Sequence, residues 1–353
     1  MKEKHLKIFA GVFVFLLLVA WLTKPKHKSV NIEDFVHNVV IGVSKEDVNS
    51  IEIYKETGGD NQVQMIFSKQ DDEWRIPTEF NCKAQTSRID RILNDLLDMT
   101  GKVRSSDPKH FSNYEISDGQ GIHLLLKDEA DKTLANLIIG KKGEDGQSGF
   151  VRFAGQEKVY SVDKNILSSI GVYGDIDTLS VFKDKSFVDL QAVNLKKEDL
   201  NMIVVGKAGK EMMLKKTEKE IEEMAADSTM KKKKVDEWVL VRGKREIDLD
   251  QKEVEKFFKD VATIRASEVV DRIGNTFADM RKSGKYGFDR PAYYVVYRPE
   301  EGQQKNLIFG KEYEKDKGYY MNVQWEGLVY KIAKYNYDKI WKWVDELPKK
   351  KKK

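Results

Sequence analysis

Cysteine is nearly absent from this sequence: among 353 residues there is one, Cys82. A disulfide framework within a single chain is therefore excluded, and cysteine usage gives little information on the compartment. Each half of the chain is long enough to bury its own core without such crosslinks. Cys82 follows a proline turn and could be exposed, but we expect it to behave as a free, small hydrophobic residue.

Catalytic and metal-binding signatures are missing as well. The five histidines include His110 and His123, which have no ligand-like spacing with each other or with Cys82. A metal site needs several such groups converging on one point. There is no G-x-S-x-G elbow, and no pair of the abundant carboxylates stands out. The sequence therefore predicts no catalytic residue, no metal and no cofactor, and it predicts that His123 lies on the surface or half-buried in a strand.

A basic field for nucleic acid is also lacking, although the net charge is +4. Residues 231–234 and 349–353 are nine lysines, and without them 53 of the 62 basic residues remain against 58 acidic ones. A nucleic-acid-binding field would cover a folded face rather than a loop and a tail. We therefore expect no nucleic-acid partner. Whether the lysine-rich end at 348–353 is native stays open.

One long apolar run is present, at residues 8–22, and it carries no charge. Fifteen helical residues span roughly 22 Å, against a hydrocarbon core of about 30 Å, and Lys7 and Lys24 can snorkel outward. A cleaved signal peptide is the rival interpretation, but no small-x-small site follows. A buried helix of a soluble protein is the other. The sequence favours an uncleaved, single-pass transmembrane anchor.

The orientation of this anchor is not fixed by charge, because three lysines precede the run and three follow it. A seven-residue head usually stays in the cytoplasm. We therefore expect the rest of the chain to lie outside the cytoplasm, at the inner membrane of the cell envelope.

A repeated phrase organises the remainder. Asn-Leu-Ile-Ile-Gly-Lys at 136–141 returns as Asn-Leu-Ile-Phe-Gly-Lys at 306–311, an offset of 170 residues that also pairs Val159-Tyr160 with Val329-Tyr330. The phrase predicts two copies of one module and marks where an inner strand leaves the sheet. The expected divisions are 1–28 (head and anchor), 29–172 (first module), 173–347 (connecting segment and second module) and 348–353 (tail).

Within each copy, alternating apolar residues predict strands, and one helical period interrupts them. In the first copy Thr86 or Ser87 can cap the helix; in the second, Asp250 and Glu253 form a capping-box-like start. The two apolar stripes consist of Ile89, Ile92, Leu93, Leu96 and Leu97, and of Val254, Phe257, Phe258 and Val261. The predicted fold class is α+β, with two tandem repeats of an antiparallel sheet packed with an amphipathic helix after the transmembrane helix.

The copies differ most at residues 215–236, where the second carries a charged insert. We expect a solvated, partly helical hairpin extension; the alternative is a charged arm for a partner. The connecting segment at 173–195 is neither Pro-rich nor Ser-rich, so we expect it to be packed rather than a free tether.

Two features invite a binding interpretation. The Gly-rich stretch 140–149 lacks the spacing of a phosphate loop and leads into a strand, so a hairpin turn is preferred. Trp74 and Trp238 occupy equivalent positions, where core packing is preferred over an aromatic platform. Any exposed part of an aromatic-rich set in the second copy is the first candidate for a binding face. This set consists of Tyr293, Tyr294, Tyr297, Tyr313, Tyr319, Tyr320, Trp325, Tyr330, Tyr335, Tyr337, Trp341 and Trp343.

The combination of an N-terminal anchor, Trp-x-Ile at 74–76, Tyr-Glu-Ile at 114–116 or Tyr-Gly-Phe at 286–288, and Phe-Lys-Asp-Lys at 182–185 resembles a bacterial domain-of-unknown-function family of the four-three-four-zero type. The family is similar to membrane-anchored envelope proteins associated with gliding-motility-type ABC transporters. The resemblance implies an extracytoplasmic, transporter-linked role and transfers no catalytic residue. The insert at 215–236 departs from the pattern.

We therefore expect a non-enzymatic accessory or binding protein that works with an ABC-type transporter. An envelope hydrolase or carbohydrate-active enzyme with an unrecognised site is the alternative, and a structural spacer is a third. The sequence does not identify a small-molecule ligand.

Overall fold

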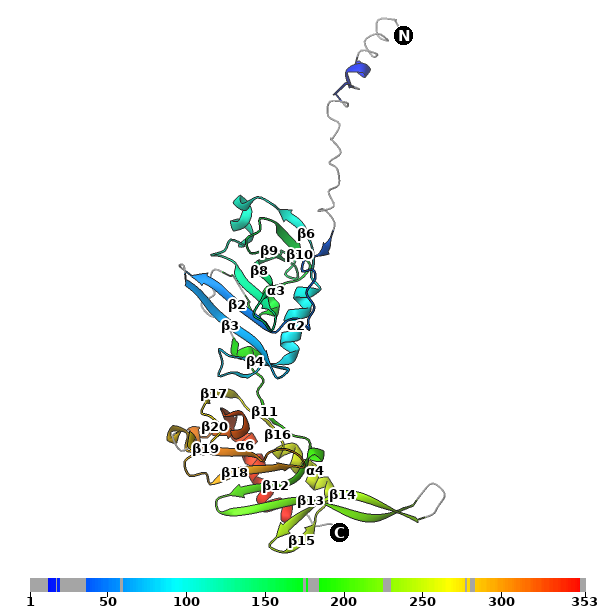
Figure 1. The fold of residues 1–353 in the computed structure, drawn as a ribbon, viewed down its shortest axis with the longest axis vertical. Helices are drawn as coiled ribbons and strands as arrows, with labels where there is room; N and C mark the ends of the chain where they lie inside the picture. The colour runs from blue at the N-terminus through cyan, green and yellow to red at the C-terminus, as the bar shows by residue number, and fades with distance from the viewer. Residues whose placement is uncertain are drawn as a thin grey trace.

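The computed structural model describes residues 12–16, 18–19, 36–57, 60–173, 176, 184–224, 230–276, 278–279 and 283–349. They form two mainly antiparallel sheets that follow one another along the long axis of the molecule (Figure 1). The predicted anchor at 8–22 lies largely outside the described residues, which include only seven positions of it. In the part of the chain that is described, no helix is both long and apolar enough to cross a membrane.

The first sheet has ten strands in the order β1-β6-β10-β9-β8-β7-β2-β3-β4-β5. They are β1 (His37–Asn38), β2 (Ser50–Thr57), β3 (Asp60–Gln70), β4 (Glu73–Ile76), β5 (Cys82–Lys83), β6 (Thr100–Ser105), β7 (Ile122–Lys127), β8 (Thr133–Lys142), β9 (Gly149–Phe153) and β10 (Val159–Val162). The helices of this half are α2 (Thr86–Leu97), the 3-10 helix η2 (Pro108–Tyr114) and α3 (Ile166–Ser169).

The second sheet has nine strands in the order β15-β14-β13-β12-β18-β19-β20-β21-β17. They are β12 (Leu200–Lys207), β13 (Lys210–Met224), β14 (Met230–Arg242), β15 (Arg245–Asp248), β17 (Glu268–Arg272), β18 (Tyr293–Pro299), β19 (Lys305–Glu314), β20 (Gly318–Val323) and β21 (Leu328–Ala333). A separate pair joins β11 (Gln191–Asn194) to β16 (Thr263–Arg265). The main helices are α4 (Gln251–Val261) and α6 (Lys334–Glu346), with short 3-10 turns η4 (Asp184–Phe187), η5 (Lys197–Asp199), η6 (Gly284–Tyr286), η7 (Gln324–Glu326) and η8 (Leu347–Lys349).

The two sheets share one order of strands. Read from its edge, β6-β10-β9-β8-β7-β2-β3-β4-β5 corresponds strand by strand to β17-β21-β20-β19-β18-β12-β13-β14-β15. Each sheet carries one long helix in the same place in the sequence, between its fourth and fifth shared strands. The predicted α+β class is confirmed, with mostly antiparallel strands and few helices.

The main core lies between each sheet and its helices. The stripe of α2 is buried except for half-buried Leu97, and all four residues of the stripe of α4 are buried. Trp74 and Trp238 are buried too, as expected, and Trp238 packs against Phe258 with ring centroids 4.7 Å apart. Burial of a large apolar side chain stabilises the fold by about 1.5–3 kcal/mol. This face of each sheet is therefore structural rather than a binding platform.

The start of α2 differs from the prediction, whereas Asp250 caps α4 as predicted. Thr86 and Ser87 lie inside α2, and the residue before it, Gln85, does not cap the helix with its side chain. Its amide instead donates to the carbonyl of Val188, 2.9 Å away in the connecting segment. In α4, the carboxylate of Asp250 accepts from the backbone N–H of Lys252, as an N-cap should.

The opposite face of each sheet carries a small second core with equivalent members. Ile138 and Val159 pack with Ile116 in the first sheet, and Ile308 and Val329 pack with Phe288 in the second. The repeated phrase thus places apolar residues on both faces of the sheet, toward the main core and toward the small second core. The offset of 170 residues applies to both faces of the sheet.

The glycine of the repeated phrase has a definite steric role. A Cβ at Gly140 would overlap the carbonyl oxygen of Tyr114, and one at Gly310 would overlap that of Tyr286. The predicted exit of the strand at this point is wrong, because β8 continues to Lys142 and β19 continues to Glu314. In both strands the pairing register shifts just after the glycine, which indicates a bulge.

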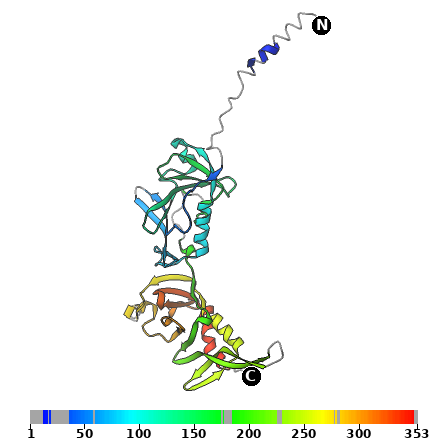
Figure 2. The same ribbon diagram turned by 45° about the vertical axis from the view of Figure 1, so that its right-hand side comes forward.

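The insert forms a β-ribbon, not a helix. Residues 216–224 of β13 pair with residues 230–238 of β14, from Lys216 opposite Trp238 to Met224 opposite Met230. We call these two stretches the arm; it projects sideways from the second sheet (Figures 1 and 2). The partly helical expectation is wrong, because the two stretches pair as strands and bring opposite charges together across the ribbon, as with Glu218 and Lys234 at 2.6 Å.

The connecting segment is packed where it is described. Phe187 is buried against Phe67, with ring centroids 5.1 Å apart, and Val188 forms a β-bridge with Ala84. The backbone N–H of Asp189 donates to the carbonyl of Lys83 at 2.8 Å. From residue 184 onward the prediction of a packed link is confirmed.

Candidate site at the junction of the two sheets

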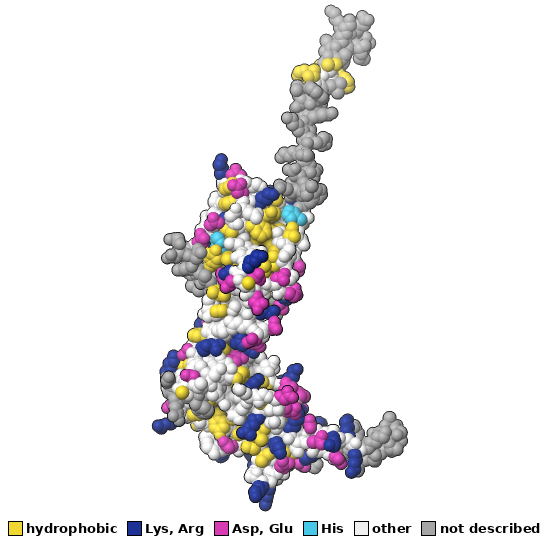
Figure 3. Space-filling view, viewed as in Figure 1, with side chains coloured by type: hydrophobic (Ala, Val, Ile, Leu, Met, Phe, Trp, Pro, Cys, Tyr) yellow, Lys and Arg dark blue, Asp and Glu magenta, His cyan; other side chains and the backbone are white. Residues whose placement is uncertain are grey.

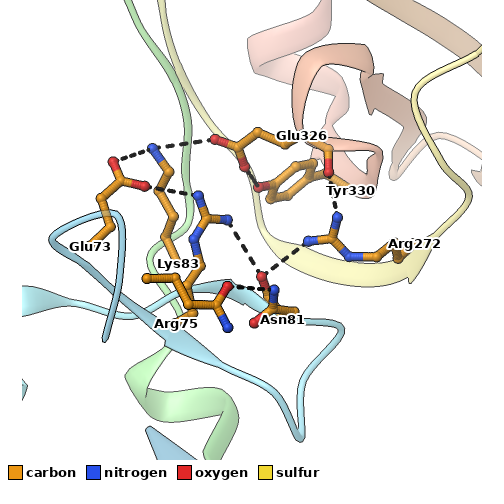
Figure 4. A network of polar contacts seen from close by, with 8 residues as sticks. Glu73, Arg75, Asn81, Lys83, Arg272, Glu326 and Tyr330 are labelled. Carbon is orange, nitrogen blue, oxygen red and sulfur yellow. Dashed lines mark hydrogen bonds and ion pairs between the residues drawn. The ribbon is translucent and has the colours of Figure 1, made fainter. Parts of the chain in front are cut away.

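Polar residues between the two sheets form a cluster of contacts that joins distant parts of the chain. The turn between β4 and β5 supplies one side, and β17 with η7 supplies the other (Figure 4). The turn is tight: Phe80 and Asn81 both have left-handed backbones, with φ of 55° and 51°. Such φ values cost energy for a residue with a side chain, so other contacts must hold them.

Arg272, at the end of β17, supplies these contacts. Its Nε donates to the carbonyl of Phe80 at 2.7 Å and its Nη2 to the carbonyl of Asn81 at 3.0 Å. Its Nη1 donates to the carbonyl of Glu326 at 2.7 Å, within the second sheet's own half. A guanidinium is suited to this task because its donors are fixed in one plane. Arg272 thus ties the first sheet to the second.

Lys83 makes the second link across the junction. Its ammonium lies 2.9 Å from Glu73 of its own sheet and 3.4 Å from Glu326 of η7. Glu73 is shared, because Arg75 also contacts it at 2.8 Å. Glu326 further accepts a long hydrogen bond of 3.5 Å from the hydroxyl of buried Tyr330.

The charges of this cluster stabilise one another. The hydrogen bond from Lys83 holds the pKa of Glu73 below its ordinary value. Burial disfavours the charged form of Lys83, but the hydrogen bond to Glu73 and the charge of Glu326 outweigh burial and raise its pKa. A general acid of a hydrolase requires a carboxyl group whose pKa is raised. Glu73 is shifted in the other direction, so its arrangement suits holding charge rather than donating a proton.

A cleft of about 330 Å³ opens beside these ion pairs; we call it the junction cleft. Its walls come from three parts of the chain: the β3–β5 region, the connecting segment and the second sheet. The lining residues are Asp72, Glu73, Trp74, Lys83, Ala84, Thr86, Asp189, Gln191, Ala192, Asn194, Leu195, Lys305, Trp325 and Glu326. Clefts between domains are common ligand sites, and about 300 Å³ is the lower end of their usual volume.

Other features that drew attention in the sequence do not meet at this cleft. The stretch at 140–149 turns from β8 into β9, as the hairpin interpretation predicts. His123 is buried rather than half-exposed, stacked on Tyr54 at 4.6 Å with its Nε2 2.9 Å from the carbonyl of Asp118, because the segment before β7 covers it. Cys82 is fully buried, so the exposed alternative is wrong.

The aromatic-rich set of the second copy is mostly internal. Tyr297, Tyr330, Tyr337, Trp341 and Trp343 are buried, and of the twelve residues Tyr335 alone is exposed, at 70 %. Trp325 is half-buried and lines the junction cleft. Among the described residues, no group of three or more potential metal ligands converges.

The surface has no single-sign field on the face that Figure 3 shows, where basic and acidic side chains are interspersed. The junction itself could not be found from sequence, because its key contact joins residues 191 positions apart. The signal nearest to it was the Trp-x-Ile strand, which ends just before the left-handed turn.

Comparison with known proteins gives one match, to a protein family. The model of the family described as "Domain of unknown function (DUF4340)" matches residues 74–242, from the strand β4 of the first sheet to the end of β14 of the second. No curated protein and no solved structure matches the chain. The matched stretch includes Lys83, but it begins just after Glu73 and ends before Arg272 and Glu326. This match supports the resemblance of residues 74–242 to a domain-of-unknown-function family of this type.

Proposed function

We propose that this protein is a membrane-anchored, extracytoplasmic accessory protein that binds a partner, an ABC-type transporter, and does not itself catalyse a reaction. The uncharged apolar run at 8–22 and the family resemblance support the location and the partner. We further propose that the two sheets descend from one module that was duplicated, since their strand orders correspond.

The absence of catalysis in this proposal rests on one observation: the charged groups at the junction are engaged in contacts that join the two sheets. Glu73, Lys83 and Glu326 are engaged with one another, and Arg272 uses three of its donors on backbone carbonyls. These contacts hold two sheets in one arrangement. An accessory protein that spans from the membrane to a partner needs such a defined body more than it needs a reactive group.

The experiment is affinity purification of the full-length chain from mildly detergent-solubilised membranes, followed by identification of the proteins that come with it. We expect subunits of an ABC-type transporter. Their absence under mild conditions counts against the proposed partner. Protease added to intact spheroplasts should digest both sheets; protection there, with digestion after lysis, contradicts the proposed orientation.

An envelope hydrolase is the second candidate, because two carboxylates, Glu73 and Glu326, flank one cleft. Retaining and inverting glycosidases both use a carboxylate pair, one member of which must be protonated before reaction. At Glu73 the hydrogen bond from Lys83 opposes that protonation. A spacer without any ligand is the third candidate, and recovery of a specific partner argues against it.

A further inference from the structure

We propose that the junction cleft binds a neutral, polyhydroxylated ligand: a short stretch of an oligosaccharide or glycan chain. The supply of such a ligand in the cell envelope rests on the proposed function. The binding chemistry itself rests on the residues that line the cleft.

The junction cleft is bounded by both sheets and by the connecting segment, so it exists only in the assembled two-sheet chain. Its position is held by the contacts of Arg272 and Lys83 across the junction. A site whose walls are already fixed loses little entropy when a ligand binds.

The walls of the cleft carry a mixture of polar groups. The cleft presents ammonium and amide donors on Lys83, Lys305 and Asn194, and carboxylate acceptors on Glu73, Glu326 and Asp189. Each hydroxyl group of a sugar both donates and accepts a hydrogen bond. A ligand with several hydroxyl groups therefore matches walls that carry both donors and acceptors.

The charged lining of the cleft disfavours anions, metal cations and apolar ligands. An anion would meet more carboxylates than lysines on these walls. A metal cation would have to displace Lys83, whose ammonium already lies between Glu73 and Glu326 at 2.9 and 3.4 Å. An apolar ligand would strip water from charged groups without replacing their hydrogen bonds, which is costly.

The indole of Trp325 lines the same cleft. Aromatic rings offer a large, rigid apolar surface, against which the CH face of a sugar ring packs. The ammonium of Lys305 lies 5.8 Å from the centroid of this ring, near the outer limit of a cation–π contact. A ligand can therefore displace the Lys305 ammonium from the ring at small cost and accept a hydrogen bond from it.

The test uses the full-length chain in detergent. It is applied to a glycan array, and the tightest-binding oligosaccharide is then titrated by calorimetry; chitotriose, cellotriose and maltotriose are titrated in every case. We expect at least one neutral oligosaccharide to bind. Lys305→Ala and Asn194→Ala should each weaken it by about tenfold, the loss of roughly 1.4 kcal/mol.

The matched control is Lys315→Ala, an exposed lysine just beyond the other end of β19, which should bind like the unchanged protein. The proposal is overturned if no oligosaccharide on the array or among the three binds, or if Lys305→Ala and Asn194→Ala bind as well as Lys315→Ala. Tighter binding of heptalysine than of any glycan would also overturn it, in favour of a basic peptide. Recovery of transporter subunits does not depend on any of these results, so the two proposals fail separately.

Discussion

Arg272 and Asn81 are joined across the two sheets by a hydrogen bond of 3.0 Å, from the guanidinium of one to the backbone carbonyl of the other. The same guanidinium holds the carbonyl of Phe80, and both turn residues have left-handed backbones. One side chain of the second sheet therefore maintains an unfavourable turn of the first.

Replacing this arginine should loosen the junction. We expect Arg272→Ala to lower the free energy of unfolding by about 1–2 kcal/mol, toward the low end for hydrogen bonds to charged groups because the residue is exposed. Calorimetry should show the two sheets unfolding in more clearly separated steps. Arg298→Ala removes an exposed arginine of β18 and is the control. An unchanged, single transition in Arg272→Ala would contradict the role given to this residue.

The glycine of the repeated phrase should not tolerate a side chain. In Gly140→Ala the new methyl group would overlap the backbone oxygen of Tyr114, and backbone cannot move aside as a flexible side chain can. We expect destabilisation of about 1–3 kcal/mol, as in overpacked cores, measured by urea unfolding. Gly119→Ala adds a methyl group where nothing lies within 4 Å and should change stability little. Equal effects of the two substitutions would refute the steric explanation.

Cys82 should be inert in the folded chain. Burial raises the pKa of its thiol to about 12, so at pH 8 almost no reactive thiolate is present, and the side chain has no solvent exposure. A thiol reagent such as DTNB should label it only after denaturant is added. Rapid labelling of the native protein would mean that the turn before β5 opens readily.

Stability should fall at acid pH in part through Glu73 and Glu268. Hydrogen bonds from Lys83 and Lys331 respectively hold the pKa of each carboxyl below its ordinary value of 4.5. Their contribution is therefore complete above pH 4.5 and is lost as the pH falls through the lower values of the folded state. The double variant Glu73→Gln/Glu268→Gln should unfold with a shallower pH dependence below 4.5. Glu144→Gln, on an exposed turn, should keep the original slope.

The arm should be dispensable for folding. Where the structure describes its side chains, at residues 216–220 and 232–237, the arm contributes no residue to a core cluster. Glu220 and Lys234 lie opposite each other, so an Asn-Gly turn in place of residues 221–233 closes the ribbon at a two-residue hairpin. We expect a change in unfolding free energy within about 0.5 kcal/mol, as for surface substitutions. Loss of partner recovery in this folded variant would make the arm a binding element; retention would make it a solvated extension.

Sequence reasoning located elements whose signal is local. The Trp-x-Ile pattern at 74–76 lies in β4, the pair Val159-Tyr160 lies in β10, and the two apolar stripes lie on α2 and α4. The equivalence of the two copies was visible in the sequence because β8 and β19 carry the same phrase and bury the same two faces. These patterns reflect burial on a fixed period, which the chain shows residue by residue.

The predictions that were wrong concern features set by pairing or contact between separate segments of the chain. The insert is rich in Glu, Lys and Met, which favour helices, but pairing between its two strands overrides that preference. Gln85 turns from its helix to Val188, 103 residues away. The contact of Gly140 with Tyr114 and that of Arg272 with Asn81 leave no local pattern, so neither the bulge nor the junction cleft could be derived beforehand.

The junction also has a consequence for synthesis of the chain. Arg272 follows Phe80 by 192 residues, so at about 5–20 residues per second the ribosome needs on the order of 10–40 seconds to supply it. During that interval the left-handed turn lacks the guanidinium of Arg272, and the edge of the first sheet beyond β5 is bridged only when Val188 reaches Ala84. An edge strand of two residues offers a nascent chain little backbone for wrong pairing. The shortness of β5 thus protects the first sheet while the second is still being made.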